Sequence, residues 1–191
     1  MKVTAFNGSA RKDGNTALMI NTVLEVLQSH GIETEHIQLA GQVIPGCIAC
    51  YQCLERKDGR CAVENDPIND YITKIRESQG IILGSPTYFA DVSANMKALI
   101  ERCGMVARVN GDLFRRKVAA GVVAVRRGGA IHVFDSLNHF FLIGQMIVVG
   151  SIYWNLGRGL KPGEVKDDEE GLRTMKILGE NMAWLLKKLY G

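Results

Sequence analysis

Five apolar segments alternate with helical patterns along this chain, and this alternation limits the fold more than any other feature. The apolar segments cover residues 2–7, 33–39, 80–84, 117–125 and 146–153. Apolar residues recur at helical spacing over residues 15–30, 67–78, 94–103, 131–143 and 169–190. Strands that alternate with helices are typical of βαβ units. The sequence therefore predicts an α/β fold, with a doubly wound five-stranded parallel sheet in the order 2-1-3-4-5.

Composition supports one folded domain over residues 1–191. The chain is 47% hydrophobic, and no flexible linker or internal repeat divides it. The net charge is only +3 and the basic residues are scattered, so we expect no nucleic-acid partner. No apolar run reaches the length of a membrane span, and no secretory signal opens the chain. We therefore expect no membrane partner and a cytoplasmic location.

Residues 8–16 join the first predicted strand to the first predicted helix and carry a candidate phosphate site. Unpaired N–H groups at a helix N-terminus attract anions. Ser9, Asn15 and Thr16 would add neutral donors, and Arg11 would add charge. The spacing is not that of a nucleotide triphosphatase, and the chain has no GxGxxG motif. The alternative is a polar turn that only caps the helix.

A second candidate loop directly follows the third predicted strand and contains Pro86, Thr87, Tyr88 and Phe89. In the predicted strand order it faces the phosphate turn. Its adjacent aromatic residues would flank a planar ring such as a flavin, or would only pack on the core. The turn at residues 126–129 follows the fourth strand and either lines the same cleft or forms a simple turn.

An insertion at about residues 45–66, after the second predicted strand, contains a compact cysteine run. Its spacing is C-x2-C-x2-C-x7-C, and its members are Cys47, Cys50, Cys53 and Cys61. Such a run can hold one [4Fe–4S] cluster. Redox-active or free thiols and a structural zinc are the alternatives. Cys103 stands apart in a predicted helix, and we expect it to be a small buried hydrophobe.

Three further features are weaker candidates for a functional site. The segment at residues 156–168 is interpreted as a lid or as an arm between subunits. The acidic residues at 167–170 are expected in the first turn of the last helix, where they complement its dipole. The four histidines are isolated, and no serine or carboxylate pattern suggests a catalytic triad.

Together, the phosphate turn, the cysteine run and the Pro86 loop resemble the iron–sulfur flavoprotein branch of the flavodoxin-like NAD(P)H-dependent FMN reductases. The resemblance implies a flavodoxin-like fold, FMN and a homodimer or a tetramer of dimers. It implies that the FMN phosphate is held by Ser9, Arg11, Asn15 and Thr16. It also implies that residues 86–89 border the isoalloxazine and that the Gly128 turn approaches the ring. The x7 gap before Cys61 is at the long end of the family pattern.

The leading hypothesis is therefore an FMN-dependent redox protein that transfers electrons between a reduced donor and an acceptor. FMN and a [4Fe–4S] cluster would carry the electrons, an electron-transfer protein such as ferredoxin would be the partner, and no side chain need act as acid or base. One alternative is an NAD(P)H-dependent reductase of FMN or quinone without a cluster. Another is a non-enzymic electron carrier or redox sensor. The sequence does not separate NADH from NADPH.

Overall fold

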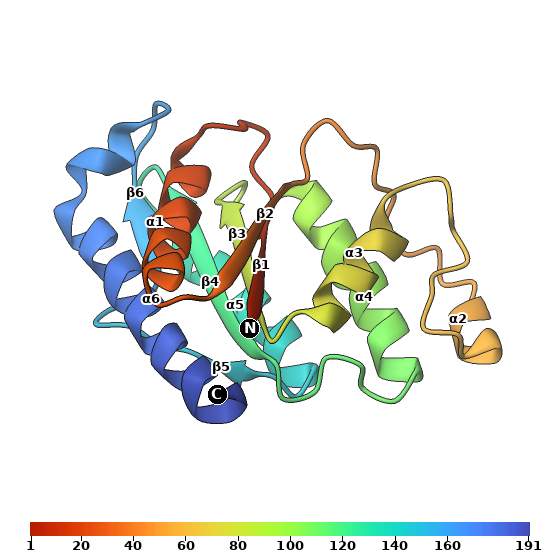
Figure 1. Cartoon of the computed structure of the whole chain (residues 1–191). Coiled ribbons are helices and arrows are strands. Elements are labelled where there is room, and N and C mark those ends of the chain that lie inside the picture. The colour runs from red at the N-terminus through yellow and green to blue at the C-terminus, as the bar shows by residue number, and fades with distance from the viewer.

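A parallel sheet forms the centre of the computed structural model, which describes residues 1–191 (Figure 1). The strands are β1 (Lys2–Asn7), β2 (Glu33–Gln38), β3 (Gly80–Pro86), β4 (Val118–Val125), β5 (Ile147–Val148) and β6 (Leu156–Arg158). Hydrogen bonds connect them in the order β2-β1-β3-β4-β5, and β6 also pairs with β4. All pairs are parallel. The predicted strand order is confirmed.

Helices cover both faces of this sheet (Figure 1). The helices on one face are α1 (Asn15–Ser29) and α6 (Glu169–Tyr190). Those on the other face are α3 (Ile68–Glu77), α4 (Ala94–Val109) and α5 (Ala130–Ile143). The cysteine-rich segment between β2 and α3 contains the short helix α2 (Gln52–Arg56), and a 3-10 turn at Glu164–Asp167 precedes α6. The predicted insertion after the second strand is therefore confirmed.

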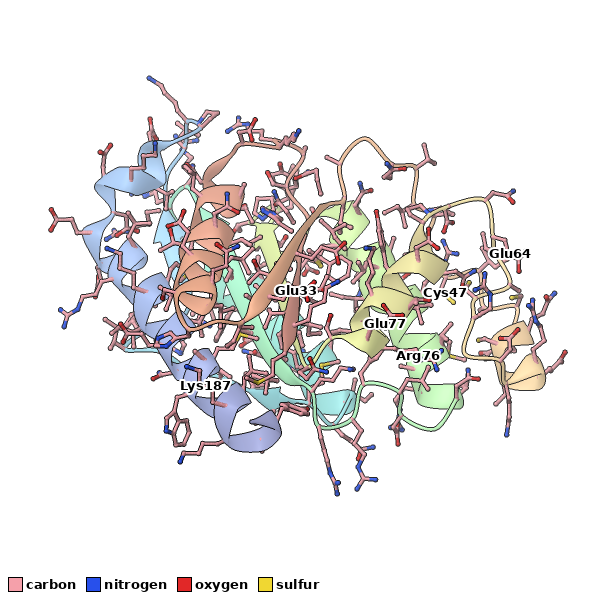
Figure 2. The ribbon with its side chains drawn as sticks, in the orientation of Figure 1. Glu33, Cys47, Glu64, Arg76, Glu77 and Lys187 are labelled. Atoms are coloured by element: carbon pink, nitrogen blue, oxygen red, sulfur yellow. The ribbon has the colours of Figure 1, made fainter.

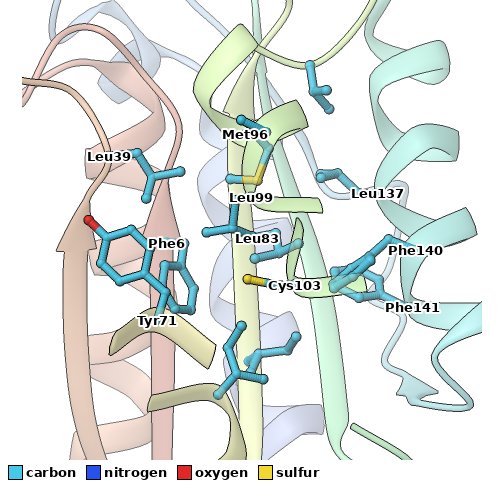
Figure 3. Packing of buried hydrophobic residues seen from close by; sticks show 14 of the residues in the cluster. Phe6, Leu39, Tyr71, Leu83, Met96, Leu99, Cys103, Leu137, Phe140 and Phe141 are labelled. Carbon is cyan, nitrogen blue, oxygen red and sulfur yellow. The ribbon is translucent and has the colours of Figure 1, made fainter. Parts of the chain in front are cut away.

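The two hydrophobic cores lie on opposite sides of the central strands. All residues of β4 are buried, and successive side chains point to opposite faces. Val118, Ala120 and Val122 contact the core under α1 and α6, whereas Ala119 and Val123 contact the core under α3, α4 and α5. Phe6, Leu83, Met96, Leu99 and Phe140 belong to the second core (Figure 3). This burial explains why the central strands are continuous apolar runs in the sequence.

The fifth predicted strand, residues 146–153, is wrong in its extent. Only Ile147–Val148 pairs with β4 in that range, and a second short strand, Leu156–Arg158, continues the edge farther along β4. The chain returns to the sheet at Asn155, which bonds β4 twice. Its Nδ2 donates to the Gly121 carbonyl (3.0 Å), and its carbonyl accepts from the Val123 N–H (2.9 Å). The chain between the two strands leaves the sheet and exposes Tyr153 and Trp154.

Parallel pairing places the loops that follow the strands at one edge of the sheet. Asn7, the last residue of β1, pairs with Gly84, and Pro86 at the end of β3 pairs with Ala124. Val125 at the end of β4 pairs with Arg158. The turns after β1, β3, β4 and β6 therefore lie together. No helix in the structure is both long enough and apolar enough to cross a membrane.

We expect Gly84→Ala to push the start of α1 away from the sheet. An alanine Cβ would lie 2.5 Å from Ile20 Cδ1, 2.9 Å from Ile20 Cγ1 and 3.1 Å from Thr16 Cγ2. Overpacking of this kind costs about 1–3 kcal/mol, so the free energy of unfolding in urea should fall by that amount. Gly150→Ala is the control, because its Cβ would meet no atom within 4 Å. Equal stability of the two variants would contradict the expected clash.

Candidate functional site

The turn between β1 and α1 is ordered by its own polar groups. The Ser9 N–H donates to Asn7 Oδ1 (3.0 Å), and the Arg11 N–H donates to Ser9 Oγ (3.1 Å). The Gly8 N–H donates to the Gly84 carbonyl (2.8 Å), which ties the turn to the end of β3. The turn therefore has a defined shape before any ligand arrives.

The first turn of α1 presents backbone donors. The N–H groups of Asn15, Thr16 and Ala17 have no backbone acceptor, and the N-cap residue Gly14 has no side chain to supply one. These groups carry the positive end of the helix dipole. The turn can therefore bind an anion with neutral donors, as the sequence predicts.

A cavity of about 200 Å³ joins this turn to the loop after β3. The residues predicted to bind a phosphate and a ring all line it, except Phe89 and Gly128. The predicted residues that do line it are Ser9, Arg11, Asn15, Thr16, Pro86, Thr87 and Tyr88. The structure thus brings two loops, separated by about 70 residues in the sequence, to one cavity.

The Asn15 side chain has a different role from the predicted phosphate contact. Its Oδ1 accepts from the N–H groups of Gly163 (2.9 Å) and Val165 (3.2 Å), and its Nδ2 donates to the Lys161 carbonyl (3.0 Å). Its amide is therefore occupied by the loop that follows β6, although its backbone N–H is not. We call this loop the lid because it is hydrogen-bonded to the phosphate turn, and the alternative of an arm between subunits stays a prediction.

Arg11 also contacts this lid. One of its guanidinium nitrogens, Nη1, donates to the Leu160 carbonyl (3.0 Å). Arg11 is exposed and lines the cavity, so its other donors are available to a ligand. Arg11 therefore joins the lid to the phosphate turn while keeping its charge at the cavity.

Phe89 and Gly128 do not line the predicted cavity. Phe89 has φ of +49° at the tip of a tight turn, which leaves its side chain fully exposed. Gly128 lines a neighbouring cavity of about 500 Å³, together with Arg127 and Tyr153. The next residue, Gly129, has a positive φ and would clash with Ala90 if it carried a Cβ (3.1 Å). The turn after β4 therefore packs against the turn after β3.

Sequence reasoning left Arg126 undecided and missed Gly159 and Leu160, and all three line the phosphate cavity. Arg126 directly follows β4. The sequence therefore places it at the carboxyl edge of the sheet, where ligand-binding residues are expected. Gly159 must lack a side chain, since a Cβ there would lie 2.6 Å from Asn15 Nδ2. No local pattern marks Gly159 or Leu160, because only the tertiary fold brings their loop to the turn.

The four clustered cysteines line a second, mostly apolar pocket. Cys47 and Cys50 are exposed, Cys61 is half-buried and Cys53 is buried. Figure 2 shows Cys47 on the segment beside α4, with Glu64 farther out on the same segment. Cys103 is buried in the core and does not line this pocket (Figure 3), as the sequence predicts.

Neighbouring helices hold the cysteine segment through its backbone. Asn69 on α3 brackets Cys61, because its Oδ1 accepts from the Cys61 N–H (2.8 Å) and its Nδ2 donates to the Cys61 carbonyl (3.0 Å). Asn110, which follows α4, donates from Nδ2 to the Cys53 carbonyl (3.3 Å). The pocket is therefore built by the packing of the segment against α3 and α4.

The thiols are close enough to interact electrostatically. Burial raises the pKa of the Cys53 thiol, and Cys61, Cys47 and Cys50 raise it further. No group of three or more Cys, His, Asp or Glu side chains is arranged to hold a single metal ion. The four thiols therefore share one pocket, and the choice among a cluster, a zinc ion and free thiols stays with the prediction.

Comparison with known proteins agrees with this geometry. A family model described as NADPH-dependent FMN reductase matches residues 1–161. An iron–sulfur flavoprotein of Methanocaldococcus jannaschii is 40% identical, with 98% of each chain covered. An iron–sulfur flavoprotein of Archaeoglobus fulgidus is 30% identical, with 99% of each chain covered.

Solved structures show the same fold. RosB, bound to 8-demethyl-8-formylriboflavin 5′-phosphate, has a TM-score of 0.76 at 20% identity, and the match covers 98% of this chain and 81% of RosB. A WrbA-like flavodoxin from Agrobacterium tumefaciens has a TM-score of 0.66 at 14% identity, and the match covers 98% of this chain and 97% of the flavodoxin. The flavodoxin-like fold is therefore confirmed.

We expect Asn15→Ala to release the lid from the phosphate turn. The Gly163 and Val165 amides lose their acceptor, so their hydrogen exchange should speed up at least tenfold, measured by mass spectrometry or NMR. Asn21→Ala is the control on the same helix, since the Asn21 side chain bonds only His36 in an exposed position. Unchanged exchange at both amides in Asn15→Ala would show that the lid is held by other contacts.

Proposed function

The chain belongs to the iron–sulfur flavoprotein branch of the NADPH-dependent FMN reductase family, and we propose that it passes electrons between a reduced donor and an acceptor through FMN and a [4Fe–4S] cluster. Family membership makes it an FMN-dependent oxidoreductase. The observation that supports the fuller proposal is the coexistence of two sites in one chain. A cavity beside a helix N-terminus suits a flavin phosphate, and four thiols share a separate pocket.

The residues of the first cavity fit FMN. The free N–H groups of α1, the Ser9 and Thr16 hydroxyls and the Arg11 guanidinium suit a phosphate dianion. Pro86, Thr87 and Tyr88 also line the cavity, where the Pro86 ring and the Tyr88 ring offer an apolar contact surface to a planar ring. This combination of polar and apolar lining suits the phosphate and the ring of FMN.

The residues of the second pocket fit a cluster. Four thiolates complete the ligand set of one [4Fe–4S] cubane. Arg102, which also lines this pocket, keeps a buried Nε–H without an acceptor. Buried donors are rarely left unpaired in proteins, so a group that accepts hydrogen bonds suits this position. The thiolates and sulfides of a cluster are such acceptors.

FMN and the cluster would have different roles in electron transfer. FMN can accept two electrons together, whereas a cluster carries them one at a time. The protein's residues would bind and orient the two groups. The FMN cavity is lined by no carboxylate, histidine or thiol, so no side chain there is suited to acid–base work near neutral pH. NADH or NADPH is the proposed donor, and its nicotinamide would approach FMN from the open side of the cavity.

The proposal also includes an oligomer of this chain and a partner protein that exchanges electrons with the cluster. The cysteine segment lies beyond α4, at the far side of the molecule from α6 (Figure 1). A homodimer, or a tetramer of dimers, would allow the cluster of one subunit to approach the FMN of another. The exposed Tyr153 and Trp154 between β5 and β6 supply an apolar surface for such contacts. A one-electron protein such as ferredoxin is the proposed partner of the cluster.

We expect Thr16→Val to weaken FMN binding at least tenfold while leaving riboflavin binding unchanged. The substitution keeps the side-chain shape but removes one hydrogen bond to a charged phosphate, which contributes about 1.5–3 kcal/mol. Affinities follow from quenching of flavin fluorescence by the flavin-free protein. Thr22→Val on the same helix is the control, because the Thr22 hydroxyl bonds the Leu18 carbonyl outside the cavity. An equal loss for FMN and riboflavin would place the phosphate elsewhere.

We expect Cys50→Ser to abolish cluster absorption while FMN stays bound. Anaerobic purification, an ultraviolet–visible spectrum and assays of iron and acid-labile sulfide are the measurements, and about four irons per chain are expected for the unmodified protein. Cys103→Ala is the control, because Cys103 lies outside the pocket and should leave iron content unchanged. An unmodified protein with flavin but no iron, even after reconstitution, would favour the family's simpler reaction, NAD(P)H-dependent flavin or quinone reduction.

A further inference from the structure

Arg102 is a fully buried cation beside the cysteine pocket. Its side chain is 1% exposed, and it projects from α4 into the cysteine segment. Nη2 donates to Cys61 Sγ (3.3 Å) and to the Val63 carbonyl (2.9 Å). Nη1 donates to the Pro45 carbonyl (3.4 Å) and forms an ion pair with Asp66. One guanidinium therefore contacts the segment both before and after its cysteine run.

The ion pair is buried on both sides. The Asp66 side chain is 2% exposed, and its Oδ1 accepts from the Ile68 N–H (3.0 Å) at the start of α3. Buried pairs contribute little net stability, because removing two charges from water costs about as much as their attraction returns. Stability alone therefore does not explain a charged pair here, where an apolar pair of similar volume would pack as well.

We propose that Arg102, neutralised in part by Asp66, is a positioning residue that holds Cys61 in the ligand set and raises the reduction potential of the cluster. This inference rests on the proposed function, since it concerns the group that the four thiols hold. It goes further by giving a role to residues that are not ligands.

The positioning role follows from the spacing of the cysteines. Cys47, Cys50 and Cys53 lie within one short stretch, whereas Cys61 follows after a gap of seven residues. Cys61 therefore depends on contacts outside the run to reach the others. Asn69 holds its backbone and Arg102 holds its sulfur, so the ligand farthest along the sequence is restrained at both ends of the residue.

The effect on potential follows from charge. Reduction adds one electron, supplied by FMN in the proposed function, and so adds one negative charge to the cluster. A buried cation that donates a hydrogen bond to a ligand sulfur stabilises the reduced form more than the oxidised form. The anionic Asp66 opposes this effect, because it pairs with Nη1 of the guanidinium whose Nη2 contacts the sulfur. Removing one charge or the other should shift the potential in opposite directions.

The experiment compares midpoint potentials of the cluster in the complete protein, by anaerobic titration followed by EPR and absorbance. We expect Asp66→Asn to raise the potential, since the amide keeps an acceptor for the Ile68 N–H but loses the charge. We expect Arg102→Met to lower it, and Arg102→Lys to lie closer to the unmodified protein because the charge remains. Iron content should fall in Arg102→Lys and Arg102→Met, since both variants lose the guanidinium whose Nη2 donates to Cys61 Sγ.

A second Arg–Asp pair, with Arg108 on α4 and Asp112 in the turn that follows the helix, supplies the control. Arg108 and Asp112 form a salt bridge of 2.8 Å at positions i and i+4, in a partly exposed position. Arg108→Met and Asp112→Asn should leave both potential and iron content unchanged. If Arg102→Met does not fold, because it leaves Asp66 unpaired, then Asp66→Asn and the double variant Arg102→Met/Asp66→Asn still test the sign.

The outcomes separate this inference from the proposed function. Unmodified protein that holds no iron after reconstitution would overturn both. A normal cluster whose potential is the same in Asp66→Asn and in the Arg102 variants would overturn only the role of Arg102. Shifts of the same sign in Asp66→Asn and Arg102→Met would also overturn it, because general damage to the pocket, and not charge, would then explain them.

Discussion

Both sites depend on the parallel pairing of β1, β3 and β4. These strands are buried on both faces, so their register is fixed by side chains that must face one core or the other. Asn7 consequently ends β1 beside Gly84, and Pro86 ends β3 beside Ala124, so the turns that follow meet at one edge. A slip of one residue would turn the apolar side chains to the wrong face and would move the phosphate turn away from the loop after β3.

Helix α4 links the two sites. It begins just after the loop that borders the FMN cavity, where the Ser93 N–H donates to Ser85 Oγ (3.0 Å) and Ser93 Oγ caps the helix. Farther along, Glu101 accepts from the Cys47 N–H (3.3 Å), and Arg102 contacts Cys61. The position of this helix on the sheet therefore sets the position of the cysteine segment.

The lid shows why the sequence does not reveal every residue that lines the cavity. Gly159 and Leu160 reach the FMN cavity only because the edge of the sheet is divided into β5 and β6, which returns the chain to the carboxyl end of β4. The apolar pattern of residues 146–153 does not reveal this division, since exposed Tyr153 and Trp154 resemble strand residues in sequence. Asn15 has a local appearance typical of a phosphate ligand, but it holds the lid through contacts about 150 residues away.

Local sequence patterns were enough to predict the first four strands and the helices that cover the sheet, the polar turn after β1 and the cysteine run after β2. These features depend on local periodicity and spacing, and their physical causes lie within a few residues of each position. Tertiary structure alone decided which side chains share a cavity, that Phe89 points into solvent and that Arg102 and Asp66 are buried beside Cys61. Those outcomes depend on desolvation and on contacts between segments far apart in the chain, which no local pattern encodes.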